Sequence, residues 1–213
     1  MGPLLMRGKL PRFQVQLIIG IAIFVLLCLI DTPFPSTAPL QSGPTLVFLG
    51  VLAGALRRWP MPDSAVLLIC IFLVLHTIGA RYIYSYVPYD VWLASVGLPE
   101  LNDIFSWERN HYDRLVHFGF GVLMVHPLSQ VLVRYWSVSP GRALYVAVEF
   151  IVATSALYEI FEWLLTLTLA PEQADAYNGQ QGDMWDAQKD MALAAVGAVL
   201  AALFEYFRFR RKT

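Results

Sequence analysis

The apolar positions of the chain fall into six blocks that are separated by polar connections. Each block approaches or exceeds the roughly 20 residues that a helix needs to cross a bilayer. The blocks cover residues 13–30, 40–56, 64–85, 112–135, 143–168 and 187–207. The second block is the weakest, because Gly43 and Pro44 can shorten it. The pattern predicts an all-α, integral membrane bundle of about six transmembrane helices.

Composition agrees with a membrane protein rather than a soluble domain. Of the 213 residues, 57% are hydrophobic and 15% are charged, against about 25% charged in soluble domains. The net charge is −1 and no basic stripe is present, so we expect the lipid bilayer and no nucleic acid as partner. No repeat or linker divides the chain, which predicts a single multi-pass membrane domain over 1–213. The oligomeric state is not indicated.

The distribution of lysine and arginine predicts the orientation in the membrane. Basic residues occur in four stretches that six crossings would bring to one side, at 7–12, 57–58, 134–142 and 208–212. The other connections lack lysine and arginine or are mostly acidic. The positive-inside rule therefore predicts that both termini lie in the cytoplasm. An alternative remains for the first block, which could be a cleaved signal peptide and would leave five crossings.

The connection at 86–111 is too long for a simple turn. It contains apolar residues that suggest a short stretch lying in the membrane interface, namely Val91, Trp92, Leu93, Val96 and Leu98.

Acidic residues, histidines and an arginine concentrate in, or just before, the outer halves of four blocks. They are His76, Asp113, Arg114, His117, Glu159, Glu162, Asp183, Asp186 and Asp190. Ionisable residues inside a membrane segment are costly and are functional candidates by default. Chance would scatter them over both halves, so this convergence predicts a polar pocket in the outer leaflet.

Helical spacing supports a common pocket. Asp113 and His117 are four residues apart and share one helix face, as do Asp186 and Asp190. The opposite face of the last block, including Ala194, is expected to pack closely against neighbouring helices.

The acidic residues can pair with Arg81, Arg114 and Lys189, can stay protonated, or can bind a cation. Carboxylates with imidazole suit a divalent metal such as Zn²⁺, Mn²⁺ or Mg²⁺. The expected metal ligands are Glu159, Glu162, Asp183, Asp186, Asp190 and His76. The expected catalytic residues are Asp113, His117 and Arg114: Asp113 would orient His117, and Arg114 or Arg81 would receive a phosphate.

Structural interpretations remain open for several of these residues. Asp183 lies where a carboxylate caps a helix, and His117 can hold a backbone carbonyl. Glu159 and Glu162 can form structural ion pairs with basic partners. In the inner half, His126 precedes Pro127 near an expected kink, and both His126 and Glu149 are expected to be structural.

Four motifs resemble the YjdF-like inner-membrane proteins, a bacterial family of unknown function. They read HTIGA at 76–80, NHYDRLVHF at 110–118, YEIFEW at 158–163 and GQQGDMWDAQKDM at 179–191. The resemblance spans about residues 60–205. It implies a multi-pass inner-membrane protein and brings no established reaction.

A weaker similarity is to VanZ-like membrane proteins, which are associated with glycopeptide-antibiotic resistance. Where that family has Lys, Gln and Asn, this chain has Arg114, Glu162 and Asp190. The two added carboxylates make metal binding more plausible here. The spacing of the last aspartates also looks like the first aspartate motif of UbiA-type prenyltransferases, but this chain lacks their further helices and second motif.

Three classes of function are compatible with this pattern. The leading hypothesis is a metal-dependent enzyme, most simply a hydrolase, acting on a lipid-linked or envelope substrate. The second is a cation- or proton-binding transporter, for which no inverted repeat or broken helix is visible. The third is a non-enzymatic structural membrane protein whose acids form ion pairs.

Overall fold

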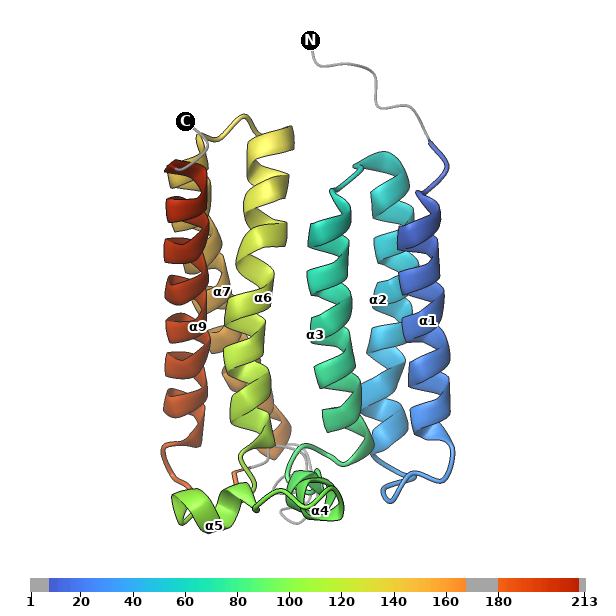
Figure 1. The fold of residues 1–213 in the computed structure, drawn as a ribbon, viewed down its shortest axis with the longest axis vertical. Coiled ribbons are helices and arrows are strands. Elements are labelled where there is room, and N and C mark those ends of the chain that lie inside the picture. The colour runs from blue at the N-terminus through green and yellow to red at the C-terminus, as the bar shows by residue number, and fades with distance from the viewer. Residues whose placement is uncertain (1–7, 168–179, 211–213) are drawn as a thin grey trace.

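The computed structural model describes residues 8–167 and 180–210, which contain only helices and their connections. The helices are α1 (Arg12–Leu29), α2 (Ala38–Arg58), α3 (Asp63–Arg81), α4 (Tyr89–Ser95), α5 (Leu101–Phe105), α6 (Tyr112–Tyr135), α7 (Pro140–Thr166) and α9 (Asp186–Arg210), as drawn in Figure 1. Within the described ranges, 6 helices are long and apolar enough to cross a membrane. The predicted all-α bundle of six spans is confirmed.

The long helices form two groups of three that lie side by side (Figure 1). One group contains α1, α2 and α3, and the other contains α6, α7 and α9. The contact between α3 and α6 joins them. Helix α1 begins and α9 ends at the same end of the bundle. We call the opposite end the outer end, following the orientation that the charge pattern predicts.

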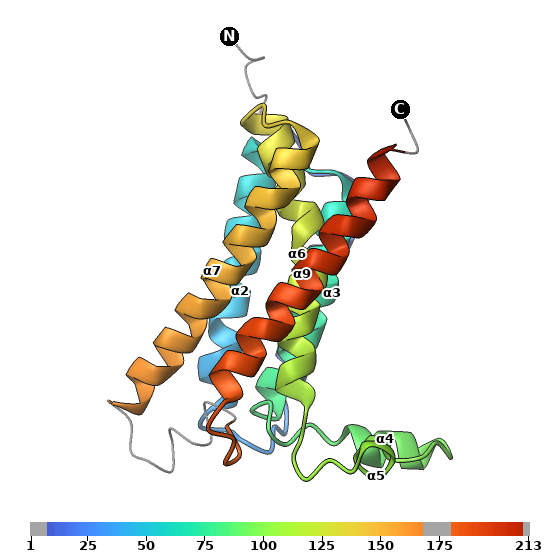
Figure 2. The same cartoon turned by 90° about the vertical axis from the view of Figure 1, so that its left-hand side faces the viewer.

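The two short helices lie at the outer end and run across the bundle axis (Figure 2). Val91, Trp92, Val96 and Leu98 of this connection are exposed. Apolar side chains on a segment that runs across the spans suit a membrane interface, as the sequence of 86–111 suggested.

The third span ends at Arg81, four residues before the predicted limit of 85. The backbone of Ile83 and Tyr84 has positive φ, and the Tyr84 N–H donates to Gly79 O at 2.8 Å. A Cβ atom on Gly79 would collide with the Tyr84 ring. Glycine thus lets this ring fold back over the helix end, a turn that the uninterrupted apolar run concealed.

Helices α6 and α9 approach each other closely through small residues. A Cβ on Gly121 would overlap the backbone of Ala194, and a Cβ on Gly197 would overlap the backbone at Phe118. Ala194 and Ala198 are fully buried in the core cluster of this group of helices. In a bilayer no hydrophobic driving force acts between helices, so close van der Waals packing of this kind stabilises their association.

The expectation that Ala194 lies on the face of α9 opposite the aspartates is wrong. Asp186, Asp190, Ala194 and Ala198 follow one another at four-residue intervals, and all are buried. A spacing of four keeps side chains on one helix face. One stripe of α9 therefore changes from acidic to small as it enters the bundle, and the tight packing lies directly below the acids.

Candidate functional site

Arg109 fixes the first residue of α9. Its Nη1 lies 2.6 Å from Asp186 Oδ1 and its Nη2 lies 3.3 Å from Oδ2, a two-pronged contact. Nη1 also donates to the carbonyl of Gln180 at 3.0 Å. Asp186 is 3% exposed, so this pair holds a buried charge. The connection before α6 is thereby tied to the start of α9.

Asp183 is held by two further cations. Arg114 Nη2 and Lys189 Nζ each lie 2.5 Å from Asp183 Oδ2. Its Oδ1 accepts the N–H of Trp185 at 3.0 Å, as a capping carboxylate does. Lys189 first, then the Trp185 N–H and Arg114, hold the pKa of Asp183 well below its usual range. Arg114 also reaches Asp186 Oδ1 at 3.2 Å.

These five residues form what we call the outer tier, comprising Arg109, Arg114, Lys189, Asp183 and Asp186. With all of them charged, three cations face two anions, so the tier carries an excess positive charge. The buried Nε of Arg114 has no hydrogen-bond partner among the described residues. An anionic group at this position would meet both the charge and the free donor.

Directly below, three residues form what we call the inner tier. One ligand atom each of Asp113, His117 and Asp190 lie within 4.8 Å of one another. The three residues are 8%, 8% and 2% exposed. Oδ1 of Asp190 is buried and has no hydrogen-bond partner in the described part of the chain. Two carboxylates and one imidazole at this separation offer the oxygen and nitrogen atoms that Zn²⁺ and Mn²⁺ bind.

Helix α7 adds the two predicted glutamates. Glu159 Oε1 lies 3.5 Å from His117 Nε2, which is also 3.8 Å from Asp113 Oδ1. Oε1 of Glu159 is buried without a hydrogen-bond partner among the described residues. Glu159 therefore borders the inner tier. Glu162 is equally buried, one turn closer to the outer end of α7.

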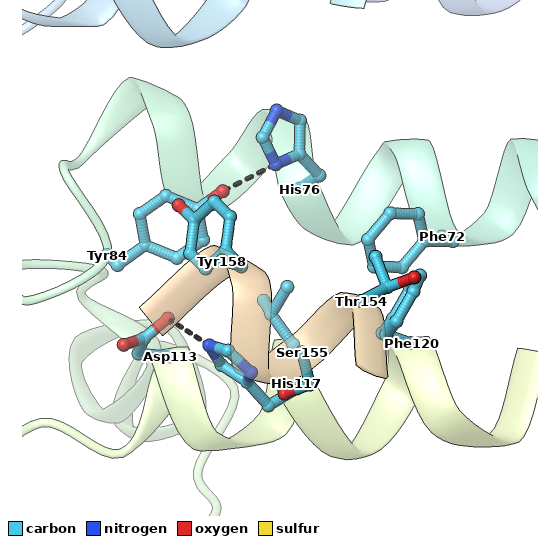
Figure 3. A pocket seen from close by; sticks show the side chains of 10 residues that line it. Phe72, His76, Tyr84, Asp113, His117, Phe120, Thr154, Ser155 and Tyr158 are labelled. Carbon is cyan, nitrogen blue, oxygen red and sulfur yellow. Dashed lines mark hydrogen bonds and ion pairs between the residues drawn. The ribbon is translucent and has the colours of Figure 1, made fainter. Parts of the chain in front are cut away.

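Two cavities flank the inner tier. The first, of about 140 Å³, lies between α3, α6 and α7 and is shown in Figure 3. His76 lies on its α3 side, with Nδ1 2.5 Å from the Tyr84 hydroxyl, and Asp113 and His117 lie across from it. The structure thus brings His76 to the same pocket as His117, on the opposite wall.

The second cavity, of about 400 Å³, lies between α7 and α9. Glu159, Glu162 and Asp186 contribute carboxylates to it. Ile160 and Trp163 line its apolar part and are largely exposed on the outside of the bundle. This cleft therefore connects the acidic site with the surface that faces the lipid.

Arg81 does not join the acidic site. Its guanidinium donates to the carbonyls of Cys28, Ile30 and Asp31, at 2.6, 2.8 and 3.2 Å. The expectation that Arg81 pairs with the carboxylates or receives a phosphate is therefore wrong. Arg109 pairs with the carboxylates instead. Sequence reasoning missed Arg109 because it lies outside the apolar blocks. Its position directly before the 110–118 motif was the available signal.

At the inner end, His126 contacts Ser64 of α3 and Glu205 of α9. The pairing with Glu205 was not anticipated, since this acid sits among the basic residues of the last turns. Glu149 is exposed on the outside of α7 and does not join this cluster.

Six membrane-length helices that enclose buried carboxylates define a multi-pass integral membrane protein. A family model described as a predicted membrane protein (DUF2238) matches residues 13–211, and the chain belongs to this family. The match includes the first two helices, outside the 60–205 range suggested by the motifs.

Among curated proteins, inner membrane protein YjdF of Escherichia coli (strain K12) is 33% identical over 166 residues, covering 76% of this chain and 73% of that protein. The predicted resemblance to YjdF-like proteins is confirmed, and with it the multi-pass inner-membrane location. No solved structure shows significant similarity.

Proposed function

We propose that this protein is a divalent-metal-dependent hydrolase that acts in the outer leaflet on an amphiphilic, lipid-linked substrate with an anionic head group. The observation that carries this proposal is the inner tier. There Asp113, His117 and Asp190 converge, and Oδ1 of Asp190 is buried without a partner. A buried carboxylate oxygen without a donor is costly, and a bound cation removes that cost.

The division of charge between the two tiers supports a cation site. Arg109, Arg114 and Lys189 direct their ion pairs to Asp183 and Asp186. Asp113 and Glu159 instead approach His117. The inner tier therefore collects acids around one imidazole, while the basic side chains bind the acids above it.

The chemistry follows from this arrangement. Asp113, His117 and Asp190 would hold the metal, which supplies an acidified water at neutral pH. Glu159 borders the group and would accept a proton from that water. The outer tier, with its excess positive charge, would receive a phosphate or similar anion. The cleft between α7 and α9 would admit the apolar part from the membrane.

A transporter requires a polar connection through the bundle. Between His117 and His126, α6 packs against α9 through Gly121, Ala194 and Ala198, which leave no room for water between the backbones. This packing supports a site that binds and reacts at one end over one that passes ions through. The orientation with both termini in the cytoplasm is part of the same proposal.

The test is metal content followed by activity. We would purify the wild type, Asp190→Asn and a control, Asp103→Asn on the exposed face of α5, in detergent. Mass spectrometry after dialysis should find near-stoichiometric Zn²⁺, Mn²⁺ or Mg²⁺ in the wild type and control, and little in Asp190→Asn. Absence of metal from folded wild type, even after reconstitution, would sink the proposal.

The hydrolase step is tested separately with the loaded protein. Phosphate release from polyprenyl and glycerolipid phosphates in mixed micelles should require the metal and should be lost in Asp190→Asn. If the protein holds the metal but releases no phosphate, it is a metal-binding protein and the hydrolase step is refuted.

A further inference from the structure

Three side chains from three different helices line up at the inner end of the bundle. Ser64 Oγ lies 3.0 Å from His126 Nε2, and His126 Nδ1 lies 3.2 Å from Glu205 Oε1. They come from α3, α6 and α9, which no sequence motif connects. A hydroxyl on one ring nitrogen and a carboxylate on the other is the order of a nucleophile, a base and an orienting acid.

The serine of this row is accessible to solvent, as a nucleophile must be, whereas the other two side chains are buried. Ser64 is exposed, whereas His126 and Glu205 are 8% and 7% exposed. A cavity of about 200 Å³ is lined by all three, together with Gln130 and Arg208. The hydroxyl thus faces a space large enough for part of a substrate, and the imidazole and the carboxylate border the same space.

The position of Ser64 in its helix adds a second argument. It is the second residue of α3. The first turn of a helix carries partial positive charge from its amide groups. An oxyanion that forms on a carbonyl carbon bonded to Ser64 Oγ would lie beside this charge, which favours acyl transfer. The Asp63 carboxylate in the same turn opposes this effect and accepts from Gln14 Nε2 at 2.7 Å.

We propose that Ser64, His126 and Glu205 form a second catalytic site, at the inner end, that hydrolyses carboxylic esters at the membrane surface. Ser64 Oγ bonds to the carbonyl carbon while its proton passes to His126 Nε2. The bond to the leaving alcohol breaks, and that alcohol takes the proton from His126. A water molecule then releases the acid by the reverse sequence, with His126 again as base. Glu205 is a positioning residue that orients the imidazole.

A purely structural role would use the same contacts to tie the two groups of helices together. The N–H at His126 Nδ1 is not directed at Glu205 as a hydrogen bond requires, so the ring must turn slightly to align the row. Catalytic contacts are often looser without substrate. Only reactivity of the Ser64 oxygen separates the two roles.

The experiment is covalent labelling with a fluorophosphonate, which reacts with activated serines. Full-length wild type in detergent should acquire the probe on Ser64, identified by peptide mass spectrometry. Ser64→Ala should abolish this label. His126→Gln should slow it at least about a hundredfold, the usual contribution of a general base. Ser129→Ala is the matched control, because Ser129 is buried on α6 beside His126 and donates to its carbonyl.

Two further measurements distinguish the outcomes. Glu205→Gln should move the pH profile of labelling, because Glu205 Oε1 faces His126 Nδ1 and is shared only with Arg208 among the described residues. Labelling should persist after chelation of metals, so this site can fail or succeed independently of the outer metal site. Folded wild type without label on Ser64, or equal labelling of His126→Gln, would overturn the proposal.

Discussion

Gly121 and Ala194 meet backbone to backbone one helical turn below His117 and Asp190. The two pairs are related by a step of four residues on both helices. The closest approach of α6 and α9 therefore sets the distance between two of the proposed metal ligands. The packing contact and the proposed metal ligands are thus separated by a single helical turn.

Substitution at this contact should disturb both stability and metal binding. Gly121→Val would force α6 and α9 apart, at a cost of about 1–3 kcal/mol typical of overpacking. We expect a lower melting temperature in detergent and a weaker affinity for Zn²⁺. Gly54→Val is the control, because nothing lies near a Cβ at that position. Equal behaviour of the two variants would show that the contact is not close in solution.

Asp190→Asn should have opposite effects with and without metal. In chelated protein the variant should melt at or above the wild type, because it removes a charge that is 2% exposed and whose Oδ1 has no partner. Saturating metal should stabilise the wild type by about 2.7 kcal/mol at a hundredfold excess over Kd and leave the variant unchanged. Thermal melts with EDTA and with Zn²⁺ measure this. A variant less stable than wild type in EDTA would contradict the unpartnered carboxylate.

Replacing Arg109 should lower the stability of the folded protein, and replacing Asp186 in the same variant should restore part of that stability. Arg109→Gln leaves the charge of buried Asp186 poorly compensated, and breaking a buried pair costs about 3–5 kcal/mol. The double variant Arg109→Gln/Asp186→Asn should recover much of this. Arg134→Gln, which loses only an exposed contact to Gln130, is the control for removing a guanidinium. Additive effects of Arg109→Gln and Asp186→Asn would refute the coupling.

Stability should fall on acidification partly through His111. Its ring stacks on Trp107 with centroids 4.1 Å apart. Burial first, then the charges of Arg114 and Arg109, lower its pKa. The unfolded chain takes up a proton near the ordinary value of about 6.5, where the folded protein does not. This contribution is therefore complete above that pH and is lost as the pH falls toward the folded value.

The measurement is the melting temperature between pH 7.5 and 5. His111→Gln should flatten the decline below about pH 6.5, where histidine titrates in the unfolded chain. Arg142→Gln, which changes an exposed charge at the inner end, should leave the slope intact. An unchanged slope in His111→Gln would mean that the His111 ring is protonated as easily in the folded protein as in the unfolded chain.

The spans were predictable because bilayer thickness fixes the length of an apolar helix. The common face of Asp113 and His117 followed from the helical period alone. Two features were misread within single helices: the turn at Tyr84, which the apolar run concealed, and the stripe of Asp190 and Ala194, which a spacing of four residues already places on one face. The sequence also did not reveal which helix faces which. Periodicity defines faces within one helix, whereas neighbours depend on packing between segments far apart in the chain.

The same reason explains the partners that were missed or misassigned. Arg109 and Asp186 are separated by 77 positions, and Arg81 lies 53 positions from the carbonyl of Cys28 that it binds. His126 and Glu205 likewise meet only because α6 crosses α9. A charged residue in a connection can turn to several helix ends, and the sequence alone does not rank them.

The clamp of Arg81 also bears on the order in which the chain is assembled in the membrane. The carbonyls of Cys28 and Ile30 at the end of α1 accept hydrogen bonds from Arg81, which is synthesised two helices later. The hydroxyl of Thr32 in turn donates to the carbonyl of Arg81. The end of the first helix therefore gains these bonds only after Arg81 has been synthesised, so its packing against the third helix is completed late in membrane insertion.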